Sequence, residues 1–177
     1  MLENKNIKVF DNIIPFQLRE KIYAKGMNSF FRLGWKDNEL LEDVKPNLYS
    51  QWSYEDLGEF PFLSYVQKCI AQTKWFNSTI LEKIIINLVK SEDVHYLHSH
   101  ANAQVVVYYM NLQWEDGWYG ETLFHDLNNL DNIIFTSTFK PGRLILFDGS
   151  IPHAIRPQSI KGPKYRITLT LIYTNKN

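Results

Sequence analysis

From residue 80 onward the chain alternates short runs of β-branched and aromatic residues with turn-forming residues, and this pattern constrains the fold more than any other feature. Valine, isoleucine, tyrosine and phenylalanine favour strands, whereas glycine, proline, asparagine and aspartate interrupt them. We therefore expect strands that include residues 84–86, 105–109, 122–124, 133–138, 143–147 and 166–173. Many short strands separated by turns predict a β-sandwich or barrel.

The first half of the chain has a different character and contains two segments that predict helices. A proline near the first turn and apolar residues at helical spacing indicate helices over 15–27 and 61–73. We expect short extended segments at 8–10 and 30–35, and a long polar loop over 36–52. Helices that precede such a sheet would cover one of its outer faces. The predicted fold class is therefore mainly β (α+β), with a double-stranded β-helix (jelly-roll) core and N-terminal flanking helices.

Length and composition narrow the class of protein further. The 177 residues fit one domain over 1–177, in which we expect 1–79 to form a helical support and 80–177 to form the core with the functional site. Lys+Arg and Asp+Glu both number 19, so nothing indicates binding to nucleic acid or attachment to a membrane. The single cysteine, Cys69, excludes an internal disulfide and a cysteine-based zinc site. No apolar run approaches the roughly 20 residues that span a bilayer, and the N-terminus lacks the apolar stretch of a signal peptide, so we expect a cytoplasmic protein.

Histidine is rare in this sequence, and its distribution is uneven. The chain has five histidines, of which His95, His98 and His100 lie within six residues. On an extended strand the side chains of residues i and i+2 point to the same face, so His98 and His100 could bind one ion. His153, from a distant strand, would complete a three-imidazole face with positions left open for substrate and dioxygen. We expect these three residues to be the metal ligands, His95 to be a surface or supporting residue, and His125 to lie at a strand end.

The last expected strand carries a second group of candidate functional residues. It alternates between a face of Arg166, Thr168, Thr170 and Ile172 and a face of Ile167, Leu169, Leu171 and Tyr173. If the apolar face packs against the outer core, the face with the arginine points into the barrel. A buried guanidinium requires an anionic partner, and two threonines beside it add hydrogen-bond donors. That combination suits a carboxylate, which arginine binds bidentately. The alternative is an edge strand with a solvated arginine.

A set of motifs follows in a fixed order along the second half of the chain. These motifs are His98-x-His100, Tyr108-Tyr109-Met110-Asn111, Trp118-Tyr119-Gly120-Glu121-Thr122-Leu123-Phe124, Pro141-Gly142-Arg143-Leu144-Ile145-Leu146-Phe147, Ile151-Pro152-His153 and Arg166-x-Thr168. In order and spacing the set resembles the iron(II)- and 2-oxoglutarate-dependent oxygenases, particularly their prolyl-hydroxylase-like branch. The resemblance covers about half of the chain.

The resemblance implies a cofactor site and an activity. It implies that His98 and His153 bind iron(II), and that Arg166 binds the distal carboxylate of 2-oxoglutarate. Tyr109 would help to hold the same carboxylate, and Thr168 would add a hydrogen bond there. The implied protein is a dioxygenase that hydroxylates a C–H bond while 2-oxoglutarate is converted to succinate and carbon dioxide. The nearest branch suggests a prolyl residue in a protein or peptide as substrate, with a small metabolite as the competing class.

The chain departs from the family at His100, where an aspartate is usual. An imidazole in place of a carboxylate raises the charge of the metal-bound site by one unit and favours zinc, copper and nickel over iron(II). Three outcomes follow: His100 completes a three-histidine site, which we expect, or it turns away and leaves a water, or catalysis has been lost. Two other classes stay open. One is a cupin-like three-histidine metalloenzyme that does not use 2-oxoglutarate, and the other is a non-catalytic jelly-roll module that binds a ligand.

Overall fold

The computed structural model describes residues 6–35, 47–93 and 95–175, and within these ranges the chain forms three helices and ten strands. The helices are α1 (Phe16–Met27), α2 (Tyr54–Gly58) and α3 (Phe62–Ile70). The strands are β1 (Ile7–Phe10), β2 (Arg32–Trp35), β3 (Asn47–Trp52), β4 (Ile80–Val89), β5 (Gln104–Tyr109), β6 (Thr122–Asp126), β7 (Asn129–Ser137), β8 (Leu144–Asp148), β9 (His153–Ile155) and β10 (Arg166–Thr174).

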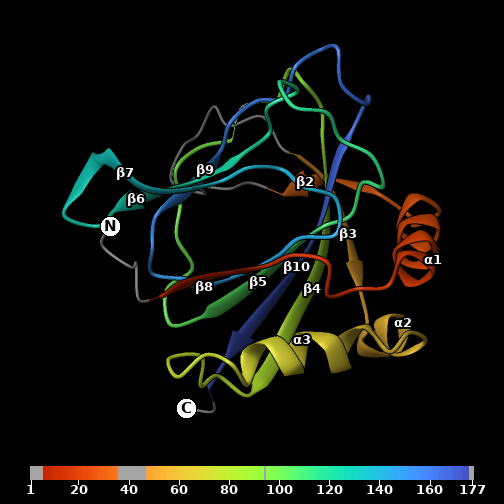
Figure 1. Ribbon diagram of the computed structural model, residues 1–177, viewed down its shortest axis with the longest axis horizontal. Coiled ribbons are helices and arrows are strands. Elements are labelled where there is room, and N and C mark those ends of the chain that lie inside the picture. The colour runs from red at the N-terminus through yellow and green to blue at the C-terminus, as the bar shows by residue number, and fades with distance from the viewer. Residues whose placement is uncertain (1–5, 36–46, 94, 176–177) are drawn as a thin grey trace.

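The strands form two antiparallel sheets. The larger sheet has the order β1-β8-β5-β10-β4-β3-β2, and the smaller has the order β7-β6-β9. The helices α1 and α3 lie on the side of the larger sheet away from β6, β7 and β9 (Figure 1). This arrangement confirms the predicted fold class, a mainly β jelly-roll core with N-terminal helices. The N-terminal part also supplies three strands, β1, β2 and β3, to the larger sheet.

Strand β10 has the hydrophobic core on one face and a cavity on the other. Its side chains alternate between the two faces, as the sequence predicts. Its apolar face packs in the main hydrophobic core with side chains of α1 and α3, among them Leu18, Ile22, Phe62 and Val66. Its other face, with Arg166, Thr168 and Thr170, points between the two sheets and lines a cavity. The main hydrophobic core therefore lies under the helices. A second apolar cluster, which includes Val105, Phe124 and Phe147, packs between the two sheets beside the cavity.

The expected loop over 36–52 is wrong in its last part, and one helix was not expected. Residues 36–46 lie outside the described residues, but Asn47–Trp52 is strand β3, which pairs with β4 through registers such as Leu48 with Leu88. Helix α2 follows at once and begins with a capping box: Ser53 Oγ accepts from Asp56 N (3.1 Å), and Ser53 N donates to Asp56 Oδ2 (2.9 Å). A polar strand and a five-residue helix give too weak a local pattern to be recognised.

An ion pair joins the segment before α1 to the start of β8. The Arg143 guanidinium donates to both carboxylate oxygens of Asp11, from Nε at 2.8 Å and from Nη2 at 2.9 Å, and Lys140 Nζ lies 3.1 Å from Asp11 Oδ2. The hydrogen bond from Arg143 is the largest influence on the Asp11 carboxyl and, with Lys140, lowers its pKa from 3.8 to about 2. Because the folded-state pKa is depressed, this pair stabilises the fold above about pH 4, and its contribution is lost as the pH falls toward 2.

Asp11→Asn should therefore lower the free energy of unfolding at neutral pH by about 1–2 kcal/mol, after allowance for the partial exposure of the carboxylate. Urea unfolding at pH 7 and pH 2.5 measures this difference, which should fall to roughly a third of its neutral value at the lower pH. Asp131→Asn is the control, because Asp131 is exposed on β7 and should give little change at either pH. An equal loss of stability at both pH values would exclude the ion pair as the cause.

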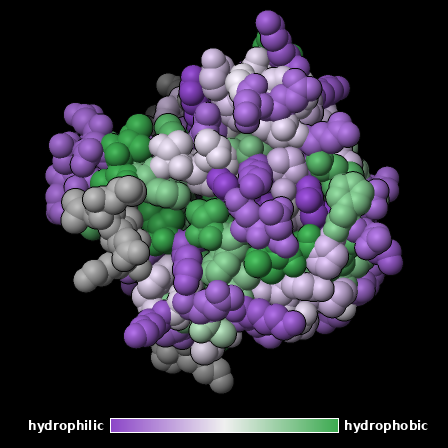
Figure 2. All heavy atoms as spheres, viewed as in Figure 1, coloured by the Kyte–Doolittle hydropathy of each residue, from purple (hydrophilic) through white to green (hydrophobic). Residues whose placement is uncertain are grey.

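The β6–β7 hairpin carries a group of exposed apolar side chains. Leu127, Leu130, Ile133 and Ile134 are 66%, 49%, 47% and 37% exposed. Figure 2 shows apolar atoms on the left of the molecule, over the region that β6 and β7 occupy in Figure 1. Among the described helices, none has the length and apolar character needed to cross a membrane.

Candidate metal centre

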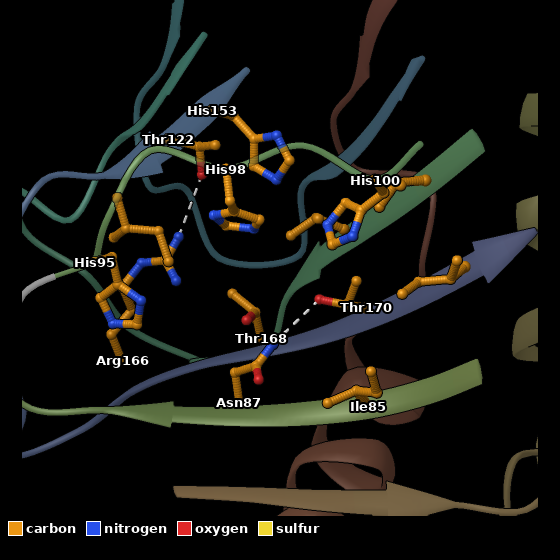
Figure 3. A pocket seen from close by; sticks show the side chains of 14 residues that line it. Ile85, Asn87, His95, His98, His100, Thr122, His153, Arg166, Thr168 and Thr170 are labelled. Atoms are coloured by element: carbon orange, nitrogen blue, oxygen red, sulfur yellow. Dashed lines mark hydrogen bonds between the residues drawn. The ribbon is translucent and has the colours of Figure 1, made fainter. Parts of the chain in front are cut away.

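Three imidazoles converge between the two sheets. His98 and His100 come from the segment between β4 and β5, and His153 is the first residue of β9. The ligand-capable atoms of the three side chains all lie within 4.8 Å of one another. His153 is buried, whereas His98 and His100 are half-buried, so the group is open to solvent on one side. Figure 3 shows the three rings facing one another above β10.

Main-chain contacts hold the three residues in place. His98 N donates to His153 O (3.1 Å), and His153 N donates to His98 O (2.9 Å), which forms an isolated antiparallel bridge. His100 N donates to Gly149 O (2.7 Å). His98 and His100 lie outside the named strands, so the expected strand is reduced here to the single bridge at His98. This bridge brings His98 next to His153 of β9.

Hydrogen bonds fix which ring nitrogen of two histidines faces the centre. Nδ1 of His98 lies 3.0 Å from the Tyr96 carbonyl oxygen, and Nδ1 of His153 lies 3.0 Å from the Ile151 carbonyl oxygen. Because a carbonyl can only accept, Nδ1 carries the hydrogen in both rings, and each Nε2 keeps a lone pair for a metal. Burial, followed by the neighbouring His98 and His100, lowers the pKa of His153 well below 6.5, so this ring stays in the neutral form that metals bind.

Arg166 is buried in the same cavity without a full set of partners. Its side chain is 1% exposed, its Nε donates to Gly120 O (2.9 Å), and its Nη2 donates to Thr122 Oγ1 (3.3 Å). Among the described residues Nη1 has no hydrogen-bond partner. Burial lowers the pKa of Arg166 from its usual value. A buried guanidinium with one free amino group is a site for an anion.

Of the two other residues expected to bind the cofactor, Thr168 lies in the cavity lining and Tyr109 does not. Thr168 lines the cavity beside Arg166 on β10. Tyr109 is fully buried behind the cavity wall, where its hydroxyl lies 2.7 Å from Thr122 Oγ1 and donates to Ser137 O (3.3 Å). The hydroxyl thus reaches the anion site through Thr122, which also contacts the guanidinium. A direct contact between Tyr109 and a bound carboxylate remains a prediction.

Two residues of the cavity were not expected there. His95 is 7% exposed and lines the cavity, although alternation had placed it opposite His98. Residues 95–97 do not form a strand, so alternation does not apply to them. Asn87 on β4 also lines the cavity, in register with Thr168. His125 lies on β6 outside the group, as expected, with Nδ1 2.6 Å from Leu130 O.

The donor set fits a divalent transition metal. Three imidazoles that offer neutral nitrogen atoms to one point are suited to zinc, copper, nickel or iron, and they leave other coordination positions open. The free Nη1 of Arg166 in the same cavity fits an organic acid that reaches from the metal to the guanidinium. The cavity has a volume of about 50 Å³.

No protein-family model and no curated protein sequence matches the chain. Its fold, however, is shared with solved structures. A prolyl-4-hydroxylase from Pseudomonas putida is 14% identical, with a TM-score of 0.75 over 98% of this chain and 95% of that one. A prolyl hydroxylase from Trichoplax adhaerens, in complex with a peptide of the hypoxia-inducible factor oxygen degradation domain, is 15% identical, with a TM-score of 0.69 over 98% of this chain and 86% of that one.

HygX from Streptomyces hygroscopicus, solved with nickel and 2-oxoglutarate bound, is 7% identical, with a TM-score of 0.72 over 97% of this chain and 83% of that one. An oxidoreductase of the 2-oxoglutarate–Fe(II) oxygenase family from Burkholderia pseudomallei is 12% identical, with a TM-score of 0.72 over 99% and 88% of the two chains. At these identities the comparisons establish the architecture. The chain shares the fold of the 2-oxoglutarate–Fe(II) oxygenases, including prolyl hydroxylases, and carries a three-histidine group in its interior.

Proposed function

We propose that this protein is a metal-dependent 2-oxoglutarate dioxygenase that hydroxylates a C–H bond. One observation carries the proposal: the three-imidazole group and the buried Arg166, with its free Nη1, line the same cavity. A metal site alone would not need a buried guanidinium, and a buried guanidinium alone would not need three imidazoles. Together they match the two ends of 2-oxoglutarate, whose keto-acid end chelates a metal and whose other end is a free carboxylate.

Each cavity residue then has a role in binding or orientation. His98, His100 and His153 hold iron(II), which when bound supplies dioxygen activation coupled to the decarboxylation of 2-oxoglutarate to succinate. Arg166 binds the distal carboxylate, and Thr168 donates a hydrogen bond to it. Tyr109 orients Thr122, and through it the guanidinium. Apolar residues of the lining, among them Val105, Val107 and Ile155, exclude bulk water from the reacting atoms. A prolyl residue in a protein or peptide is one candidate substrate and a small molecule is the other.

Anaerobic titration of the metal-free protein with iron(II) and 2-oxoglutarate tests the proposal. A chelated keto-acid gives a visible charge-transfer band, and we expect this band to saturate at one equivalent of each component. Nickel(II) is a redox-inert substitute for measuring 2-oxoglutarate affinity. If the protein binds metal without any dependence on 2-oxoglutarate, the cupin-like alternative, which the three-histidine donor set also fits, becomes the better assignment.

His100→Asp tests the position at which the sequence departs from the family. If His100 is a ligand, an aspartate there should preserve iron(II) binding or strengthen it, on the order of tenfold, because a carboxylate adds a negative charge to the site. The selectivity for zinc over iron should fall at the same time. Competition between the two metals, followed by calorimetry, measures both effects. His125→Asp is the matched control and should change neither. Loss of all metal binding in His100→Asp would show that His100 has another role.

A further inference from the structure

The cavity has an unusual balance of charge. Its lining consists of isoleucine, valine, threonine, asparagine, histidine and Arg166, and no acidic side chain belongs to it among the described residues. The carboxylate of Glu121 lies outside the lining and interacts electrostatically with Arg166. Arg156 Nη1 lies 3.7 Å from the same carboxylate, so Glu121 and Arg156 are counted together as neutral. Arg166 is therefore the one charged side chain of the described lining.

Loading the site with metal and cofactor would not neutralise it. A divalent ion and the Arg166 guanidinium bring three positive charges, three neutral imidazoles bring none, and dianionic 2-oxoglutarate removes two. One positive charge is left over. With an aspartate in place of His100, the net charge of the loaded site would be zero. A partly buried charge without a counter-charge is unfavourable, so the loaded site should attract one further anion.

The residues that line the cavity extend along β10 beyond the position expected for 2-oxoglutarate. Side chains two residues apart on a strand are about 6.5–7 Å apart, so Thr170 lies about 13 Å along β10 from Arg166. A five-carbon diacid anchored at Arg166 is shorter than this. The far part of the lining contains Thr170 and Asn87, together with the apolar Ile85, Val105 and Ile172. Figure 3 shows Thr170 and Ile85 on the His100 side of the site, away from Arg166.

Polar groups in this far part can receive a carboxylate. Asn87 Nδ2 donates to Thr170 Oγ1 at 3.4 Å, so the Thr170 hydroxyl hydrogen is available to a further acceptor. Asn87 Oδ1 has no hydrogen-bond partner among the described residues, but it is an acceptor and does not bind a carboxylate. The donor that this wall offers is therefore the Thr170 hydroxyl. The hydroxyl lies beside the apolar side chains, which suits a short aliphatic acid.

We propose, on the basis of the proposed function, that the substrate of this site is a small aliphatic monocarboxylate. Its carboxylate accepts a hydrogen bond from the Thr170 hydroxyl and supplies the missing negative charge. Its alkyl part lies against Ile85, Val105 and Ile172. The histidine at position 100 then has a consequence for specificity, because it makes the loaded site selective for an anionic substrate over a neutral one of the same shape.

Isobutyrate and isobutyramide form a matched pair of probes with nearly the same shape and different charge. Each is titrated anaerobically into protein loaded with iron(II) and 2-oxoglutarate, and the shift of the charge-transfer band gives its dissociation constant. We expect isobutyrate to bind at least tenfold more tightly than isobutyramide. His100→Asp should remove this preference while the band persists. Thr170→Val should weaken isobutyrate severalfold, whereas Thr136→Val, on the exposed face of β7, should not.

The other outcomes overturn the proposal. Equal affinity for the two probes would show that no residual charge is felt, and no shift with either would show that the far part does not bind a small acid. Bleaching of the band by isobutyrate would place the anion at Arg166, in competition with 2-oxoglutarate. If chloride shifted the charge-transfer band as much as isobutyrate does, the site would bind an inorganic anion and not the carboxylate of a substrate. Absence of the band before any probe is added would instead overturn the proposed function, and the charge count with it.

Discussion

Arg166→Met is expected to weaken 2-oxoglutarate binding by about two to four orders of magnitude, because each lost charge-assisted hydrogen bond contributes roughly 1.5–3 kcal/mol. The guanidinium is the sole cationic side chain of the described cavity lining, and its free Nη1 is the group that a carboxylate would meet. Metal affinity without 2-oxoglutarate should stay unchanged, since Arg166 is not one of the three clustered histidines. Titration of 2-oxoglutarate into the nickel-loaded protein measures the first effect, and calorimetry with nickel alone measures the second.

Methionine is chosen because it retains most of the apolar volume of the arginine stem. Removing a buried cation that lacks a full set of partners should leave the fold as stable as before, or more stable. Arg143→Met is the matched control: Arg143 is also largely buried but is paired with Asp11, so its loss should destabilise the protein without affecting 2-oxoglutarate. If Arg166→Met kept full metal-dependent activity, a cupin-like enzyme without 2-oxoglutarate would be favoured.

His153→Ala should abolish metal binding. Loss of an outer hydrogen-bond partner of a ligand lowers metal affinity by roughly 10–100-fold, and loss of the ligand itself should exceed this. Of the three histidines, His153 is the one whose backbone anchors His98 and whose ring is enclosed by Phe124 and Phe147, with the Phe147 ring centroid at 4.7 Å. The backbone bridge does not depend on the imidazole, so β9 should keep its place. Equilibrium dialysis against zinc, nickel and iron(II) gives the affinities.

His125→Ala provides the comparison for His153→Ala. His125 lies on β6, the strand that pairs with β9, but its ring is bonded to the Leu130 carbonyl outside the cavity. Its removal should leave metal affinity unchanged, and far-UV circular dichroism should show both variants folded. Undiminished binding in a folded His153→Ala variant would mean that the metal sits elsewhere in the chain.

The sequence predicted the features that depend on neighbouring residues and missed those that depend on contacts between distant segments. The period of two along β10 is a local property, and it correctly separated the face toward the helices from the face with Arg166, Thr168 and Thr170. The grouping of His98, His100 and His153 was also expected, with His153 on a distant strand, but the sequence gives no sign of the contact that joins the two segments. Their convergence rests on a backbone bridge between segments far apart along the chain, and no local pattern encodes that contact.

The same limit explains the residues that were misplaced or missed. His95 lies in the cavity because the chain leaves β4 through an irregular segment, whose path depends on the β9 contact. Strand β3 has a polar sequence and becomes a strand by pairing with β4. Tyr109 follows the alternation of β5, yet its hydroxyl ends at Thr122 because the smaller sheet packs across it. Tertiary contacts, not propensity, decided each of these positions.

The main chain at position 100 is held by contacts that do not involve its side chain. His100 N donates to Gly149 O, Ala103 N donates to His100 O (3.3 Å), and Gly149 N donates to Ala103 O (2.9 Å). A Cβ on Gly149 would lie 2.6 Å from His100 O, so only glycine permits this approach. The codons for histidine and aspartate differ in their first base alone. A point mutation can therefore exchange imidazole for carboxylate on an unchanged turn. With His100 as a ligand, as proposed, such an exchange would alter metal preference and substrate charge without altering the fold.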